Sequence, residues 1–158
     1  MRHTQVKGEA SMEIRSILFP TDFSVTTKNT AAFAADLALK YGAKVYILHV
    51  IYDIARDSGW YGAPLQLDTV YDDIRKSAME EMERVSMEAF GDGIEVEKVI
   101  KIGIPYSDIL KFSDDNSVDL IVIGSHGKKG LDRVIFGSTV QKVLRRSKCH
   151  VLTVRERQ

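Results

Sequence analysis

Two groups of small polar residues follow a buried-strand pattern late in the chain, and both could hold an anion. The apolar, β-branched run Val118–Ile123 predicts the strand. Gly124–Gly127 comes directly after it, where glycine permits tight turns and close approach of a ligand. Gly137–Thr139 then opens a helical pattern that continues to Arg146. Because N–H groups at a helix N-terminus and the helix dipole both attract phosphate, the pattern predicts a phosphate site.

The spacing of these glycines differs from the commoner nucleotide-binding motifs. A Walker A loop needs Gly-Lys followed by Ser or Thr, whereas Lys128–Leu131 has the order Lys-Lys-Gly-Leu. No stretch supplies the G-x-G-x-x-G of dinucleotide-binding folds. From Gly124 to Ser138 the chain instead has G-x2-G-x9-G-S, with basic residues in between. A turn followed by a helix cap is the alternative, because isolated glycines most often serve turns, but three at this spacing favour phosphate binding.

Length and composition fit one soluble globular domain. The chain has 158 residues, of which 44% are hydrophobic and 28% charged, so it can bury a substantial core. Its formal net charge is zero, so no overall field would recruit nucleic acid or an anionic membrane. The single cysteine, Cys149, excludes an internal disulfide framework, and we expect a buried structural thiol. No apolar run is long enough to span a membrane and no signal peptide is recognisable, so we expect a cytoplasmic protein.

Residues 13–158 are expected to form this single domain, preceded by a polar, flexible leader at residues 1–12, within which Met12 could equally be the start residue. The stretch Tyr52–Leu67 lacks periodicity and is expected to be a long connecting loop. Pro20 cannot donate to a sheet ladder, so the first strand is expected to end before it. The predicted strands are Ile14–Phe19, Lys44–Ile51, Ile94–Ile102, Val118–Ile123 and Cys149–Val154. The predicted helices are Thr26–Tyr41, Asp68–Phe90, Tyr106–Asp114 and Gly137–Arg146.

Two of the predicted helices have a periodic apolar face that should be buried. The positions concerned are Ala31, Ala34, Ala35, Ala38 and Leu39 in the first helix and Val70, Ile74, Ala78, Met82 and Val85 in the second. The strict alternation of strands and helices predicts an α/β fold, a five-stranded parallel sheet sandwiched by helices. Ligands of such sheets bind beyond the C-terminal strand ends. Asp22, Val50, Gly103 and Gly124 all fall near those ends, so four separate segments point to one pocket.

Several stretches of this chain resemble the universal stress protein family. Ile17–Ser24 (ILFPTDFS) is similar to the first strand and acidic turn of that family, and Leu48–Val50 to the end of its second strand. Gly103–Pro105 resembles its third turn, and the glycine spacing resembles that of ATP-binding members. The resemblance extends from about Ile14 to Val154. It implies the Rossmann-like, adenine nucleotide α-hydrolase-like fold.

The resemblance also implies a ligand and an assembly. ATP, or else ADP or AMP, would bind with its adenosine on the first three strand ends and its phosphates, with any Mg²⁺, on the glycine loop. Dimerisation would occur by pairing of the last strand, Cys149–Val154, in two copies. The residues that the resemblance places at the nucleotide are Pro20, Thr21, Asp22, Val50, Gly103, Ile104, Ile123, Gly124, Ser125, His126, Gly127, Gly130, Gly137, Ser138 and Thr139. No direct metal ligand and no catalytic residue are predicted.

Three functions follow from this reading. The first is a nucleotide-dependent stress-response switch or sensor, in which nucleotide binding changes a surface that a protein partner sees. The second is a slow ATPase, for which His126 and Asp22 are the nearest candidates for a base, although no second catalytic group is predicted beside His126. The third is a nucleotide-free dimeric interaction module. His49 lies within a predicted strand and is expected to be a core histidine with its hydrogen bonds satisfied.

Overall fold

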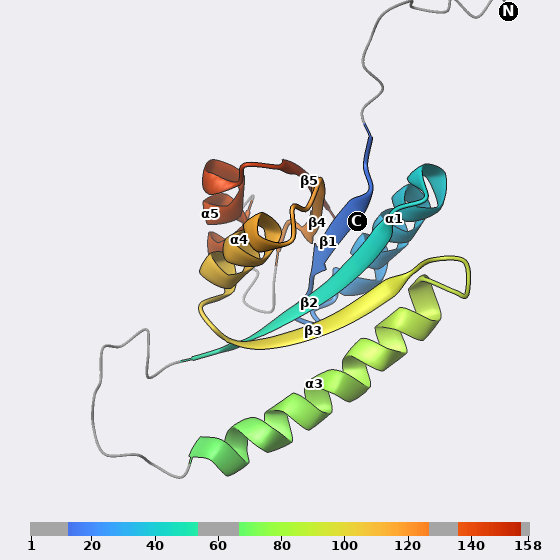
Figure 1. Cartoon of the computed structure of the whole chain (residues 1–158). Helices are drawn as coiled ribbons and strands as arrows, with labels where there is room; N and C mark the ends of the chain where they lie inside the picture. Colours follow the sequence, from blue (N-terminus) through green and yellow to red (C-terminus); the bar gives the residue numbers. More distant parts are fainter. Residues whose placement is uncertain (1–12, 54–66, 127–135, 156–158) are drawn as a thin grey trace, which may run out of the picture.

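Five strands alternate with four helices in the part of the chain that the structure, a computed structural model, describes, namely residues 13–53, 67–126 and 136–155 (Figure 1). The strands are β1 (Ser16–Pro20), β2 (Lys44–Tyr52), β3 (Val96–Gly103), β4 (Leu120–Gly124) and β5 (His150–Val154). The helices are α1 (Thr27–Tyr41), α3 (Leu67–Ala89), α4 (Pro105–Asp115) and α5 (Ser138–Arg146). The predicted flexible leader, most of the predicted loop, and the predicted site residues Gly127 and Gly130 lie outside the described residues.

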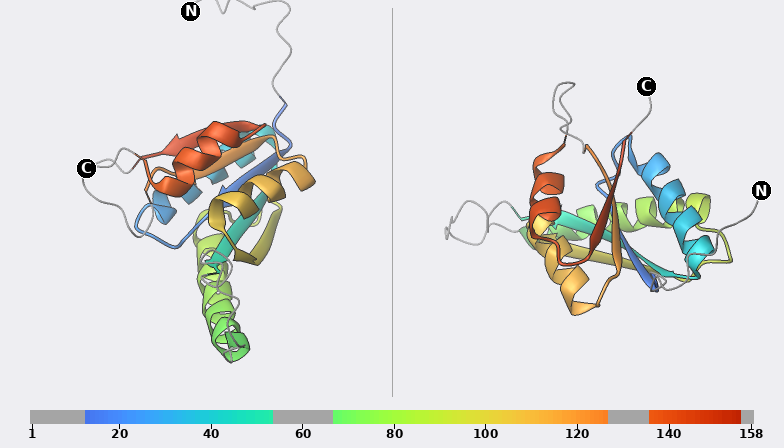
Figure 2. Two further views of the ribbon diagram at one scale, coloured as in Figure 1. Left: turned by 90° about the vertical axis from the view of Figure 1, so that its left-hand side faces the viewer. Right: turned by 90° about the horizontal axis from the view of Figure 1, so that it is seen from above.

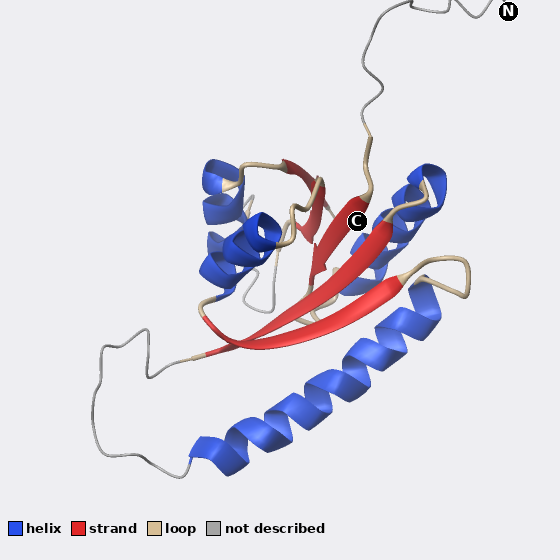
Figure 3. Ribbon diagram, in the orientation of Figure 1, coloured by secondary structure: helices blue, strands red, loops and turns tan. Residues whose placement is uncertain are grey.

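The strands form one parallel sheet in the order β3-β2-β1-β4-β5, so the predicted fold class is confirmed. Helices α1 and α3 pack together against one face of this sheet, and α4 and α5 against the other (Figures 2 and 3). The central strand β1 is buried between the two layers. Its side chains alternate, with Ile17 and Phe19 in the α1–α3 core and Leu18 in the α4–α5 core. This double burial is why the strand is apolar at every one of these positions.

All nine predicted segments form the predicted type of structure, with ends that shift by one or two residues. The expectation that β1 ends before Pro20 is wrong. Pro20 belongs to the strand and is in register with Leu48, because a proline keeps its carbonyl and the neighbouring Thr21 N–H donates to the Leu48 carbonyl at 2.9 Å. Cys149 is half-buried rather than buried, because it lies just before β5, with its Sγ 3.4 Å from Ser147 Oγ.

The predicted apolar faces are correct only in part. Val70 and Ile74 are 51% and 41% exposed, whereas Ala78, two turns further along α3 than Val70, is buried. Both residues belong to the N-terminal part of α3, the end of the helix that projects from the body of the molecule in Figures 1 and 2. Leu39 is 62% exposed because it lies on the flank of α1 that faces α3, not on the face that packs on the sheet. No helix in the described ranges is long and apolar enough to cross a membrane.

Candidate functional site

The sheet changes its winding direction between β1 and β4. The chain moves from β1 to β2 and β3 on one side, and β4 and β5 lie on the other. Strands β1 and β4 pair over only two residue pairs, Ile17 with Leu120 and Leu18 with Ile121, whereas β4 pairs with β5 over five. Beyond these two pairs, both strands continue without pairing to each other within the described residues. A switch point of this kind is where open α/β sheets bind ligands, at the C-terminal strand ends.

The turn between β1 and α1 is held by side-chain oxygens. Thr21 Oγ1 accepts from the Phe23 N–H at 3.1 Å and lies 3.0 Å from Thr27 Oγ1, so the buried Thr21 hydroxyl joins the turn to the helix. Asp22 Oδ1 accepts from the Ser24 N–H at 3.0 Å. The carboxylate therefore caps the turn, which is the purely structural role available to an Asp at this position.

Strand β2 supports the same turn from the side. His49 Nδ1 lies 2.8 Å from the Thr21 carbonyl oxygen, and because a carbonyl only accepts, Nδ1 must carry the proton. The His49 ring also stacks on Phe23, with centroids 4.5 Å apart and planes inclined by 32°. Phe23 has φ 57°, a left-handed conformation that costs a non-glycine residue energy. His49 is half-buried and makes the hydrogen bond that the sequence analysis expects of a core histidine. Together with its ring contact to Phe23, this bond stabilises the β1–α1 turn.

The two halves of the glycine signature meet at the end of β4. Ser125 is fully buried; its N–H donates to the Val154 carbonyl of β5 at 2.8 Å and its carbonyl accepts from the Gly137 N–H at 2.9 Å. Gly137 is the residue that precedes α5, with Ser138 exposed and Thr139 half-buried in the first turn. The N–H groups of this first turn therefore begin beside the end of β4. Apart from the Gly137 N–H, which the Ser125 carbonyl already accepts, these N–H groups belong to the donor set that the sequence predicted for phosphate.

His126 and the N-terminus of α1 complete this edge. His126 Nδ1 lies 2.9 Å from Ser125 Oγ, and the His126 carbonyl accepts from Thr26 Oγ1 at 3.0 Å. Thr26 thus links the β1–α1 turn to the residue that follows β4. Thr26 is predicted from the sequence only as the start of a helix and not as a site residue, and its only further signal is the run of Thr and Ser residues between residues 21 and 30.

The third strand end on this edge is where β3 leads into α4. Gly103 pairs with Tyr52, and the Ile104 N–H donates to Asp108 Oδ2 at 2.9 Å, so Asp108 caps the start of α4. A Cβ on Gly103 would overlap this carboxylate, with Asp108 Cγ only 3.0 Å away. Val50 is half-buried, one strand from β1.

The structure therefore places all of the predicted site residues that it describes along one edge. They lie at, or within three residues of, the C-terminal end of a strand, or in the first turn of α5. Ile123 is buried inside β4, in register with Thr153. Direct hydrogen bonds join the β1 end to β2, the α1 N-terminus to the β4 end, and the β4 end to β5 and α5.

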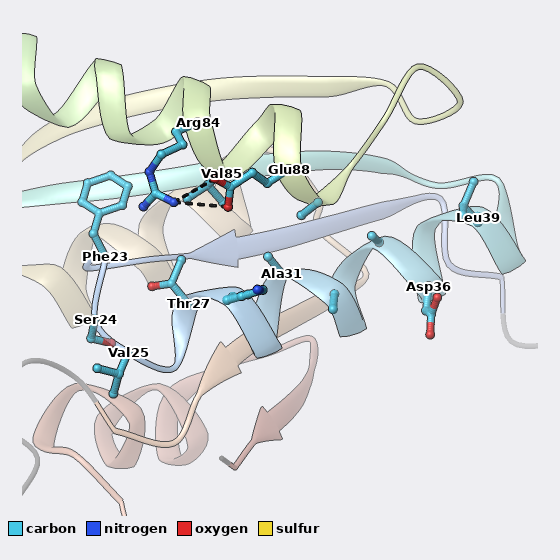
Figure 4. A pocket seen from close by; sticks show the side chains of 14 residues that line it. Phe23, Ser24, Val25, Thr27, Ala31, Asp36, Leu39, Arg84, Val85 and Glu88 are labelled. Carbon is cyan, nitrogen blue, oxygen red and sulfur yellow. Dashed lines mark hydrogen bonds and ion pairs between the residues drawn. The ribbon is translucent and has the colours of Figure 1, made fainter. Parts of the chain in front are cut away.

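A separate groove of about 360 Å³ lies between α1 and α3 (Figure 4). Its lining comes from the β1–α1 turn and the facing flanks of the two helices, with the ion pair of Arg84 and Glu88 on one wall. None of the residues predicted for the nucleotide lines it.

The pKa of the partly buried Asp119 is lowered, but this carboxylate is not near the predicted nucleotide site, because it precedes β4 and so lies at the opposite end of the sheet from the C-terminal strand ends. No cluster of three or more potential metal ligands occurs among the described residues.

Comparison with known proteins identifies the family. The model of the universal stress protein family matches residues 13–155. The chain belongs to this family. Universal stress protein MJ0577 of Methanocaldococcus jannaschii is 30% identical over 159 residues, covering 93% of this chain and 98% of its own. A solved structure of protein MJ0577 superposes with a TM-score of 0.81 at 29% identity, covering 92% and 99% of the two chains.

Two further structures of universal stress proteins share the fold and were solved with nucleotides. One, from Archaeoglobus fulgidus, is in complex with dAMP and is similar at a TM-score of 0.64 and 23% identity, covering 90% of this chain and 98% of its own. The other is in complex with cAMP, at a TM-score of 0.60 and 21% identity, with the same coverage. Because both structures are less than 25% identical to this universal stress protein, they show only that it has the same fold.

Proposed function

We propose that this universal stress protein binds an adenine nucleotide, ATP in the first instance, across the strand ends between β1 and α5. The observation that carries the proposal is the hydrogen bond from the Gly137 N–H to the Ser125 carbonyl, because it sets the α5 N-terminus beside the end of β4. Phosphates would lie against the N–H groups of Ser138 and Thr139, with the hydroxyls of these two residues beside them, because the Ser125 and Gly137 N–H groups already donate to carbonyls. A Mg²⁺ ion would be held through the phosphate oxygens.

The adenosine would lie toward β1 and β2. Pro20–Asp22 and Val50 form the inner side of this region and Gly103–Ile104 the outer wall. Relatives of the same fold bound to dAMP and to cAMP support an adenine base as the recognised part. We propose that nucleotide binding acts as a switch, since α5 begins at the phosphate donors and its other surface faces solvent.

The first test is to denature freshly purified protein and to identify the released small molecules by mass spectrometry, followed by calorimetric titration of ATP, ADP, AMP and GTP. We expect an adenine nucleotide to be released or, from an empty protein, micromolar binding of ATP with discrimination against GTP. A protein that releases no nucleotide and ignores added ATP would contradict the proposal.

Ser138→Asp separates binding from folding. An acidic residue in the first turn of α5 stabilises the helix through its dipole by about 0.3–1 kcal/mol, but it repels phosphate. We expect ATP affinity to fall at least tenfold with no loss in Tm. Ser77→Asp, an exposed position on α3, adds the same charge and should leave the affinity unchanged. Equal affinity in the two variants would place the phosphates away from α5.

We also propose that two copies pair through β5. The two sheet edges differ, because β3 carries Glu97, Lys98 and Lys101, whereas β5 has no Asp, Glu, Lys or Arg. Charged side chains protect an edge strand from pairing. Leu152 on β5 is 37% exposed, and Phe33 is 46% exposed on the flank of α1 from which Asn29 donates to the Arg155 carbonyl. This apolar surface would be covered in a dimer.

Sedimentation equilibrium tests the pairing. Leu152→Lys places a charge on the β5 edge and should convert a dimer to a monomer. Leu39→Lys, at a position that is 62% exposed on α1, makes the same change away from that edge and should leave the dimer intact. A monomeric parent protein, or a Leu152→Lys variant that remains dimeric, would overturn the assignment.

A further inference from the structure

Charge is unevenly distributed over this molecule, although the chain has 22 basic and 22 acidic residues. Between Ser138 and Arg155 there are five basic residues and no acidic residue. Helix α3, by contrast, contains seven acidic and three basic residues. The two helices lie on opposite faces of the sheet (Figure 2). Although its net charge is zero, the protein therefore has one acidic and one basic surface, and each can attract a partner of opposite charge.

Three cations of α5 form the centre of the basic surface. Lys142, Arg145 and Arg146 are exposed, while Val140 and Val143 of the same helix are buried. Within the described part of the chain, none of these three cations makes an ion pair. Some basic side chains elsewhere do so at 2.7–2.8 Å from a carboxylate oxygen, namely Arg84, Lys98, Lys111 and Lys148. The charge of α5 is therefore left uncompensated by the protein's own described side chains.

An aromatic ring positions two of these cations. Lys142 Nζ lies 4.4 Å and Arg146 Cζ 5.5 Å from the centre of the Tyr106 ring, at the start of α4. The two residues are four apart, so their side chains leave the helix about 6 Å from one another on one flank. The helix dipole accounts for cations in the last turn, Arg145 and Arg146, but not for Lys142, which precedes that turn.

We propose that the α5 face, formed by Lys142, Arg145 and Arg146, docks an acidic helical segment of a protein partner. Carboxylates four residues apart on a helix have the spacing of Lys142 and Arg146. The Tyr106 ring is covered by Lys142 and Arg146, so it is not open to stack on a nucleic-acid base.

Fluorescence anisotropy with two probes tests the assignment. The first probe is a labelled 20-residue helical peptide with glutamates four residues apart and alanines between them, and the second is a labelled single-stranded RNA of 20 nucleotides. The variant Lys142→Gln/Arg145→Gln/Arg146→Gln removes the three charges of the α5 face. The control Lys28→Gln/Lys40→Gln/Lys76→Gln removes three exposed charges from α1 and α3, and so has the same net charge. Circular dichroism and Tm verify that both variants are folded.

We expect the peptide to bind the parent protein, to weaken at least tenfold in the α5 variant and to remain within twofold in the control. Rising salt should weaken the binding, because the contacts are exposed charges. Equal weakening in both variants would attribute the binding to net charge and overturn the proposal. RNA binding that is tighter than peptide binding and is lost only in the α5 variant would also overturn it, in favour of a nucleic-acid surface.

Discussion

Gly103 and Gly124 occupy equivalent places in this molecule, each at the C-terminal end of a strand beside the proposed nucleotide, and neither has a positive φ. In both, the volume that a Cβ would take is already filled by the protein's own oxygens. At Gly103 the oxygen is the end of the Asp108 side chain, whereas at Gly124 Thr26 Oγ1 and Thr30 Oγ1 would lie 2.6 and 3.1 Å from the Cβ. At both positions, contacts within the protein are enough to favour a glycine, whether or not a ligand binds beside it.

The two positions differ in how far the neighbour can yield. Asp108 can rotate away from Gly103 at the loss of one capping hydrogen bond to the Ile104 N–H. Thr26 cannot do so as easily, because its hydroxyl donates to the His126 carbonyl and its Cβ would itself lie 3.2 Å from the new carbon. The glycine beside β4 should therefore tolerate substitution less well than the one beside β3.

The largest effect is expected for Gly124→Ala. The added methyl group would push the α1 N-terminus from the end of β4 and should destabilise the protein by about 1–3 kcal/mol. Urea unfolding followed by circular dichroism measures this change. Gly93→Ala is the matched control, because its Cβ would make an ordinary contact of 3.7 Å with Leu39, and its effect should stay within about 0.5 kcal/mol. Equal stability of the two variants would remove the proposed difference.

Asp119→Asn should have an intermediate effect on stability. Like Asp108, Asp119 accepts hydrogen bonds from backbone N–H groups, but no glycine lies beside it. Burial raises the pKa of Asp119, but the N–H groups of Arg15 and Ser16, at 2.9 and 3.0 Å, outweigh this and hold that pKa below its usual range. A carboxyl with a depressed pKa stabilises the fold above its unfolded pKa, and that stability is lost as the pH falls through the folded pKa.

We therefore expect Asp119→Asn to cost about 1–2 kcal/mol at pH 7, and the difference from the parent to shrink as the pH is lowered below about 4. Urea unfolding of both proteins across this range gives the comparison. Asp36→Asn, at an exposed position on α1, should show no such pattern. A stability difference that did not change with pH would mean that Asp119 acts by shape and not by charge.

Gly103→Ala should have the smallest effect, below about 1 kcal/mol. The methyl group displaces the Asp108 carboxylate, so its cost is the lost cap, which the reduced freedom of the unfolded chain partly offsets. Asp108→Ala loses the same cap and should cost about 1 kcal/mol. Since both changes remove one interaction, the double variant should be no less stable than Asp108→Ala alone. A strictly additive loss in this double-mutant cycle would show that Gly103 contacts something other than Asp108.

The sequence predicted the order and type of all nine elements from apolar runs, periodic apolar positions and the Gly and Pro residues between them. Strands such as β1 and β4 are continuously apolar, which only double burial in a parallel sheet explains, and the helices repeat their apolar residues every three or four positions. Because ligands of parallel sheets bind at the C-terminal strand ends, the sequence also predicts that Asp22, Val50, Gly103 and Gly124 lie on one edge, as they do in the structure. Helix boundaries and the exposure of Val70 and Ile74 depend on packing beyond the helix itself, so periodicity alone did not predict them.

The internal structure of the site could not be predicted for the same reason. Thr26 meets the His126 carbonyl across 100 residues of sequence, and no local pattern reports such a contact. The stacking of Phe23 on His49 depends on a left-handed conformation that propensity disfavours at phenylalanine. The roles of Gly103 and Gly124 likewise depend on side chains supplied by helices. Whether these glycines also contact a nucleotide remains a prediction.

The short pairing between β1 and β4 has a consequence for how the protein opens. The ladder of two residue pairs joins the β3-β2-β1 part of the sheet to β4 and β5, whereas β2 and β3 share eight pairs. Cooperative opening follows the weakest boundary, so the backbone amides of β4, β5 and α5 should exchange with deuterium through a lower free energy of opening than those of β2 and β3. The edge of the molecule that presents the glycine signature is thus also the seam along which the native state first comes apart.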